Sequence, residues 1–155
     1  MSRTDRRLKF ATLDDAVREL DRLAKARSLK TSGKWDWPQT LIHCAQSVEY
    51  SITGFPEPKS VLFQRTVGAA AFAVFSWRGR MKHNLAEPIP GAPPIPHESV
   101  VTVAMSQLLK AISDFRTCQE PLHPHFAYGA LGKGEYERAH AMHMADHFSV
   151  FDIGA

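Results

Sequence analysis

The chain has 155 residues, of which 44% are hydrophobic and 23% are charged, a composition typical of one folded globular domain. We expect a single domain over residues 1–155 that begins with a basic tail at residues 1–9. The net charge of +3 arises entirely in that tail. Residues 10–155 are neutral overall and lack the basic bias of a nucleic-acid-binding protein.

Sequence patterns argue against membrane insertion and secretion. No uncharged apolar run approaches the ~18 residues that span a membrane. The Arg6-Arg7 pair is followed by a charged segment at residues 14–19, where an export signal would have an apolar region. Cys44 and Cys118 lie far apart in the sequence, which fits a reduced, cytoplasmic protein better than a disulfide-stapled one. We therefore expect a cytoplasmic protein without a membrane or nucleic-acid partner.

Helical periodicity dominates the chain, and no Asn-Gly or Asp-Gly hairpin signal occurs, which predicts an all-α fold. The first helix is expected over residues 13–27, with Thr12 as its N-cap and residues 31–33 as its exit loop. The second helix should open at Trp37-Pro38, because proline is favoured in the first turn, and should end near residues 53–54.

The third expected helix, residues 60–78, is apolar around most of its circumference. Such a helix needs cover, either from neighbouring elements as the most central helix of the fold or from a second subunit. We expect a homodimer formed through this helix.

Two more helices are predicted at residues 98–116 and 133–152. Five prolines within residues 88–96 exclude a helix there and indicate a long extended crossover. Helices of these lengths with one long, Pro-rich crossover predict an antiparallel four-helix bundle, in which sites are built from side chains that face the interior.

Three of the eight histidines lie on the last predicted helix. At 100° per residue, His140, His143 and His147 fall within about 60° of one another, on a face that also carries Ala139 and Phe151. That face is expected to be buried, and histidines four residues apart can converge on one cation. Two interpretations fit this pattern: a metal site, or core histidines bonded to carbonyls or carboxylates.

The second predicted helix carries a polar stripe without any charged residue. The stripe consists of Gln39, Thr40, His43, Gln46, Ser47 and Tyr50. Because an exposed helix face normally carries Lys, Glu or Arg, the stripe is typical of the wall of an internal pocket, which Tyr136 of the last helix is expected to line as well. An exposed face that lacks charge is the alternative. If His43 faces His143 and His147, the three form an open metal site.

Three segments resemble the DinB-like superfamily and, within it, a bacterial subfamily of unknown function. They are TSGKWDWPQTLIHCAQS at residues 31–47, HPHFAYG at 123–129 and HAMHMADH at 140–147. The resemblance implies a four-helix bundle, often dimeric, with a divalent metal held by one histidine of the second helix and a His-x3-His pair of the last.

Matched by position to that pattern, the ligands would be His43, His143 and His147, with zinc or nickel as the expected metal. His140 has no counterpart there. It is the catalytic candidate, as an orienting residue or proton shuttle beside the metal, or else an alternative ligand.

Relatives in that superfamily include metal-dependent thiol transferases, which use low-molecular-weight thiols such as bacillithiol or mycothiol, and a maleylpyruvate isomerase. The resemblance implies an enzyme whose metal activates a thiol or water, acting on a small-molecule substrate as a transferase or hydrolase. The alternative hypothesis is a non-enzymatic, dimeric binding or stress-associated bundle whose metal is structural or absent.

Other polar residues carry weaker signals. Asp146 points about 100° away from His147 on the helix, so we expect it to make a surface or loop contact and not to bind metal. His125 and Tyr128 are expected either to close the pocket mouth or to shape a turn. His83 has no partner that its spacing reveals.

Overall fold

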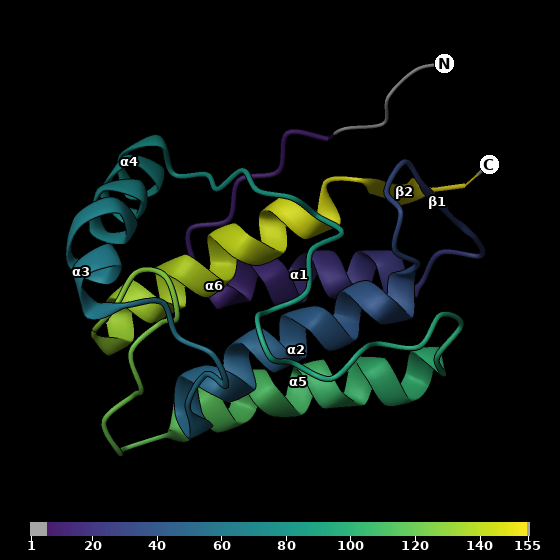
Figure 1. Cartoon of the computed structure of the whole chain (residues 1–155). Helices are drawn as coiled ribbons and strands as arrows, with labels where there is room; N and C mark the ends of the chain where they lie inside the picture. Colours follow the sequence, from purple (N-terminus) through teal and green to yellow (C-terminus); the bar gives the residue numbers. More distant parts are fainter. Residues whose placement is uncertain (1–5, 155) are drawn as a thin grey trace.

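The computed structural model describes residues 6–154, which form a mostly helical fold (Figure 1). The elements, in chain order, are α1 (Leu13–Ala24), β1 (Leu29–Thr31), α2 (Trp37–Thr53), α3 (Val61–Phe63), a π-helical turn η1 (Gln64–Gly68), α4 (Ala69–Arg78), α5 (Val101–Thr117), α6 (Lys133–Phe148) and β2 (Phe151–Ile153). The predicted helical fold is confirmed in its main feature, and a small sheet corrects the expectation of an all-α chain.

The long helices α1, α2, α5 and α6 enclose the main core. Helix α2 lies against both α5 and α6, and α1 packs against α6 (Figure 1). Large side chains fill the space between them, among them Leu20, Leu41, Leu108, Phe115 and Phe148, each at most 1% exposed. Because α2 contacts α6 directly, polar residues on their facing sides are brought together inside the molecule.

The start of α2 is determined by its N-cap. The Asp36 carboxylate accepts a hydrogen bond from the backbone N–H of Gln39 at 2.8 Å, and the Gln39 side chain accepts one from the backbone N–H of Asp36 at 3.0 Å. This reciprocal pair is a capping box, and Pro38 occupies the first turn as the sequence predicts. The cap sets which residues of α2 face α6.

The end of the chain differs from the prediction. Helix α6 ends at Phe148 and not at residue 152, and β2 pairs antiparallel with β1 so that Phe151 lies opposite Thr31. Residue 31 is thus part of a strand and not of an exit loop, and α1 ends at Ala24 instead of residue 27. The cause is burial, because Phe151 packs its ring against Trp37 with 5.0 Å between centroids. A continued helix would withdraw that ring from the core.

The predicted basic tail is only partly described, since residues 1–5 lie outside the described part of the chain. Arg6 is bound to the folded body. It pairs with Glu19 at 2.6 Å and donates to the backbone oxygens of Phe151 and Phe148.

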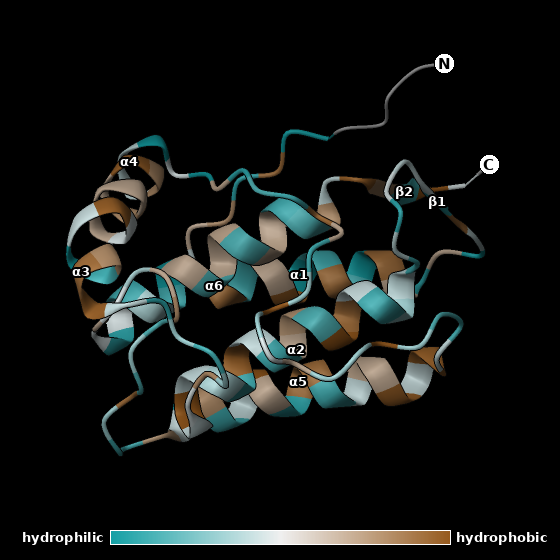
Figure 2. Ribbon diagram, in the orientation of Figure 1, coloured by the Kyte–Doolittle hydropathy of each residue, from teal (hydrophilic) through white to brown (hydrophobic). Residues whose placement is uncertain are grey.

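The third predicted helix is present as the run α3, η1 and α4, but it is not the central helix of the fold. Apolar residues of this run are exposed, namely Val61, Leu62, Val67, Val74 and Trp77, the last at 86%. Figure 2 shows brown, hydrophobic residues along α3 and α4, which stand beside the N-terminal end of α6. The interpretation in which the rest of the chain covers this helix is therefore wrong.

The crossover between α4 and α5, residues 79–100, contains no helix, as its prolines predict. It runs along α6 and α2 (Figure 1), packs the buried Met81 and Ile89 against the interior and brings the more exposed His83 to α6. Among residues 6–154, no helix is both long and apolar enough to cross a membrane.

Candidate metal centre

Three histidines from two helices converge where α2 faces α6. One ring nitrogen each of His43, His143 and His147 lies within 4.8 Å of the others. The Nε2 atoms of His43 and His143 are 3.2 Å apart. His43 and His147 are buried, and His143 is partly exposed. The structure thus brings together the three residues whose spacing suggested a cluster.

Burial keeps these imidazoles neutral. Desolvation, reinforced by the neighbouring His83, lowers the pKa of His43 from 6.5 to about 3. Desolvation and the surrounding histidines lower the pKa values of His143 and His147 well below the ordinary value. A neutral imidazole has one nitrogen with a free lone pair, which is the form that binds a metal ion.

In two of these rings, the nitrogen that faces away from the cluster, Nδ1, has no hydrogen-bond partner among the described residues. Among residues 6–154, Nδ1 of His43 and Nδ1 of His143 are buried without a hydrogen bond. An unsatisfied buried polar atom costs about 1–3 kcal/mol, so this pair does not behave as a satisfied core network. Trp35 covers the cluster on another side, with ring centroids 4.9 Å from His43 and 6.2 Å from His147.

A fourth histidine joins the group from the crossover. His83 Nε2 lies 3.1 Å from His147 Nε2, and the rings of His83 and His143 stack at 5.0 Å. His83 Nδ1 also lies 2.8 Å from the carboxylate of Asp146. Asp146 makes the loop contact expected for it, with His83 as the partner. Sequence reasoning missed His83 because the crossover has no periodicity from which a side-chain direction could be inferred.

His140 lies one turn before His143 and has a protein partner. Its Nε2 is 3.2 Å from the Ser51 hydroxyl, which itself donates to the Val48 carbonyl. His140 therefore donates from Nε2, and its Nδ1 is left without a proton. Desolvation lowers the pKa of His140 to about 3. The residue also lines the cavity beside the cluster.

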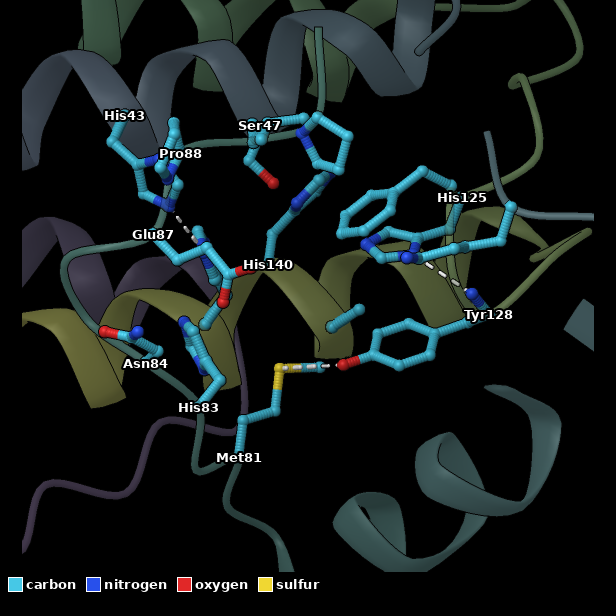
Figure 3. Close-up of a pocket in the computed structure, with 16 residues that line it drawn as sticks. His43, Ser47, Met81, His83, Asn84, Glu87, Pro88, His125, Tyr128 and His140 are labelled. Carbon is cyan, nitrogen blue, oxygen red and sulfur yellow. Dashed lines mark hydrogen bonds between the residues drawn. The ribbon is translucent and has the colours of Figure 1, made fainter. Parts of the chain in front are cut away.

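A cavity of about 190 Å³ adjoins the cluster. In Figure 3, His43, His83 and Asn84 lie at one end, His125 and Tyr128 at the other, and Ser47 and His140 between them. His125 and Tyr128 belong to a turn closed by a bridge between His125 and Gly129, as one of the two alternatives predicts, and their rings stack at 4.2 Å and line the cavity.

The crossover supplies much of the cavity's apolar wall, with Met81, Pro88, Ile89 and Pro90. The exposed Lys59 and Glu87 bring one charge of each sign to the lining. The cavity is thus mostly apolar away from its histidines.

The uncharged stripe of α2 is buried, as expected for an internal wall, since Gln39, Thr40, Gln46 and Ser47 are each at most 9% exposed. Of the six residues predicted for the pocket, only Ser47 lines this cavity. Gln39 instead caps α2 and donates to the Ile95 carbonyl of the crossover. The stripe therefore extends beyond the cavity, and the crossover covers part of it.

The two tyrosines predicted for the pocket take structural positions. The Tyr136 hydroxyl donates to the His123 carbonyl at 2.6 Å, and its ring stacks on His140. Tyr50 packs against Phe55, with 5.7 Å between ring centroids. Neither lines the cavity beside the cluster.

Comparison with known proteins identifies the family of the chain. The model of a family described as a protein of unknown function, DUF1569, matches residues 2–152. No curated protein and no solved structure matches the chain. The matched segment includes the histidine cluster, Asp146 and the cavity, and the chain therefore belongs to the DUF1569 family.

Proposed function

We propose that this protein is a metal-dependent enzyme that holds a divalent transition metal, zinc or nickel, through His43, His143 and His147. The observation that carries the proposal is the convergence of three neutral imidazoles, with donor atoms within 4.8 Å of one another, beside a cavity that His43 and His143 line. Three nitrogen ligands with one position left open are typical of catalytic zinc sites.

The contacts of the cluster favour a metal over a purely structural role. A buried structural histidine has hydrogen-bond partners, and His140 meets that condition through Ser51. Among residues 6–154, His43 and His143 have only each other's Nε2 as a hydrogen-bond partner, and a metal ion bound to both atoms would replace that contact. Their separation of 3.2 Å is close to the roughly 3.3 Å between two ligand nitrogens of a tetrahedral zinc site.

A divalent cation at this position would lower the pKa of a water or thiol enough to supply a nucleophile near neutral pH. Three neutral ligands leave its charge uncompensated, which favours an anionic group at the open position. We therefore propose a thiol-dependent transferase or a hydrolase. Its co-substrate is a low-molecular-weight thiol or water, and its substrate is a small electrophile bound against the apolar cavity wall.

His140 is the catalytic candidate in this reaction, as a residue that orients the reacting group or passes on its proton. Its ring lines the cavity, and its Nε2–H is held by Ser51, so the unprotonated Nδ1 is available to accept a hydrogen bond from that group. Replacement of His140 is expected to lower turnover while most of the metal stays bound.

We also propose that the fold is the antiparallel four-helix bundle of the DinB-like type. The contacts of α2 with α5 and α6, and of α1 with α6, support this assignment. The origin of the histidines, one from α2 and two from α6, supports it as well. The free cysteines Cys44 and Cys118 favour a cytoplasmic location.

The first test is metal content. Protein purified without a histidine tag or chelating resin is expected to bind one zinc or nickel per chain. His143→Ala and His147→Ala should abolish binding, and His123→Ala, at an exposed position, should not. Full stoichiometry in both cluster variants would refute the assignment.

The second test is activity. Metal-loaded wild type should conjugate a small thiol to at least one electrophile of a broad panel, or hydrolyse it, faster than His43→Ala. The exposed apolar face of α3 and α4 favours the alternative function, a non-enzymatic dimeric binding protein. Equal rates for wild type and His43→Ala across the panel would support that alternative.

A further inference from the structure

The proton of His83 is located by its hydrogen bonds. The Asp146 carboxylate oxygen Oδ2 accepts from His83 Nδ1 at 2.8 Å and from the backbone N–H of His83 at 3.1 Å. A carboxylate only accepts hydrogen bonds, so Nδ1 carries the proton, and a neutral His83 has its free lone pair on Nε2. The Asp146 side chain is 11% exposed, which shelters this contact from water.

That lone pair is directed at the cluster. His83 Nε2 lies 3.1 Å from His147 Nε2, and the His83 ring stacks on His143 with planes 14° apart. In the metal-free protein with a neutral His83, the proton of this contact is on His147 Nε2, which donates to His83 Nε2. If His147 binds a cation through Nε2, that proton is lost. The lone pairs of the two Nε2 atoms, 3.1 Å apart, then face each other without a proton between them.

A cation bound to both His83 Nε2 and His147 Nε2 would remove the repulsion between their lone pairs. The 3.1 Å separation resembles the 3.2 Å between His43 Nε2 and His143 Nε2, and both are near the roughly 3.3 Å ligand spacing of tetrahedral zinc. A ligating histidine usually donates its other nitrogen to a carboxylate, which sets its tautomer and orientation. The Asp146 carboxylate already accepts a hydrogen bond from His83 Nδ1. The Nδ1 atoms of His43 and His143 have no such partner among residues 6–154.

We propose that His83 is a fourth ligand of the metal in the resting protein, with Asp146 as the residue that positions it; this inference rests on the proposed metal site. His83 differs from the other three ligands in its position in the fold. It stands on the crossover outside any helix, and its side chain is 32% exposed. A movement of the crossover can close its ring onto the cation, and the reverse movement frees a coordination position beside the cavity without disturbing α2 or α6.

The test compares zinc affinity and the visible spectrum of the cobalt-substituted protein in wild type, His83→Ala and Asp146→Ala. We expect both substitutions to weaken zinc binding by about 10–100-fold. His83→Ala should also shift the cobalt absorption bands, because water replaces an imidazole. His97→Ala is the matched control, since His97 lies on the same crossover and pairs with Asp36 at 2.9 Å. It should change neither property.

The outcomes separate this inference from the proposed site. Absence of stoichiometric zinc in wild type would refute the three-histidine site itself. Normal zinc binding by wild type, with the affinity and cobalt spectrum unchanged in His83→Ala, would overturn the fourth ligand alone. Weaker binding with an unchanged spectrum would also overturn it, because His83 would then act only through His147. Thermal melts of the metal-free variants identify any loss of folding.

Discussion

The buried histidines fall into two groups according to what their ring nitrogens contact. His140 donates to Ser51, and His125 accepts backbone N–H groups from Ala127 and Tyr128 at its Nδ1, at 3.1 and 3.2 Å. Each of these rings has one defined tautomer and a protein partner. The ring nitrogens of the cluster mainly contact one another. Metal chemistry is therefore expected where partners are lacking, and structural roles where they are present.

His125 should make stability depend on pH. Desolvation, with a smaller contribution from His140, lowers the pKa of His125 from 6.5 to about 3. Between these values the unfolded chain binds the proton and the folded chain does not, so stability is full above about pH 6.5 and falls as the pH drops toward 3. The loss approaches about 1.4 kcal/mol per pH unit for one such group.

The matched substitution is His125→Asn, whose side-chain oxygen can still accept the two backbone N–H groups but does not titrate. Urea unfolding in the presence of a chelator at pH 7, 6 and 5 should show a slope about one proton smaller than in wild type. His123→Gln, at an exposed position, should keep the wild-type slope. An unchanged slope in His125→Asn would show that His125 is not buried in the neutral form.

At the residue scale, the cluster was predictable and its surroundings were not. His43, His143 and His147 lie on helices, where spacing gives direction, and their convergence follows once α2 packs on α6. His83 lies on an irregular segment, so its contact with Asp146 depends on the path of the crossover. The same path explains why Gln39 meets Ile95 and not the cavity.

At the scale of the elements, the π-helical turn is held against the loop that lines the cavity. The Gln64 side chain donates to the Lys59 carbonyl at 3.1 Å and lies 3.4 Å from the Phe126 carbonyl. Gly68 faces the same loop so closely that an added Cβ would lie 1.7 Å from the Ala127 oxygen. The element thus positions the cavity wall through backbone contacts.

Gly68→Ala should therefore displace that loop. Overpacking of this kind costs about 1–3 kcal/mol, and it should also weaken binding of any ligand that touches Phe126 or Tyr128. The matched control is Gly134→Ala on α6, where an added Cβ would meet nothing within 4 Å. That control should raise stability by about 0.4–1 kcal/mol. Chemical denaturation of both variants is the measurement, and equal stabilities would contradict the close approach.

Element boundaries show where periodicity stops being informative. Helix α2 begins at Trp37, as predicted, because its capping residues are local in sequence. Helix α6 ends four residues before its predicted end because Phe151 packs against Trp37. Strand β2 then pairs with β1, which lies near the other end of the chain. Local signals predict caps, whereas long-range contacts decide where a helix gives way to a strand.

At the scale of the whole molecule, the candidate site depends on three separate parts of the chain. Helix α2 supplies His43, α6 supplies His143 and His147, and the crossover covers them with His83. The two helices are held by the core, whereas the crossover is irregular and partly exposed. A packed pair of helices under an irregular, partly exposed cover suits a site that must admit a substrate.

The exposed run of α3, η1 and α4 leads to the proposal that the protein is a homodimer. Leu62 is 74% exposed and Trp77 86%, on a run that also exposes Val61, Val67 and Val74, and such surfaces mark interaction sites. A two-fold contact would pair this face with itself.

Light scattering at micromolar concentration should give the mass of two 17.3 kDa chains for wild type and of one chain for Leu62→Glu and Trp77→Glu. Val103→Glu, at an apolar position on α5 that is 64% exposed, should leave the dimer intact. A single-chain mass for wild type, or loss of the dimer only in the α5 variant, would contradict this interface.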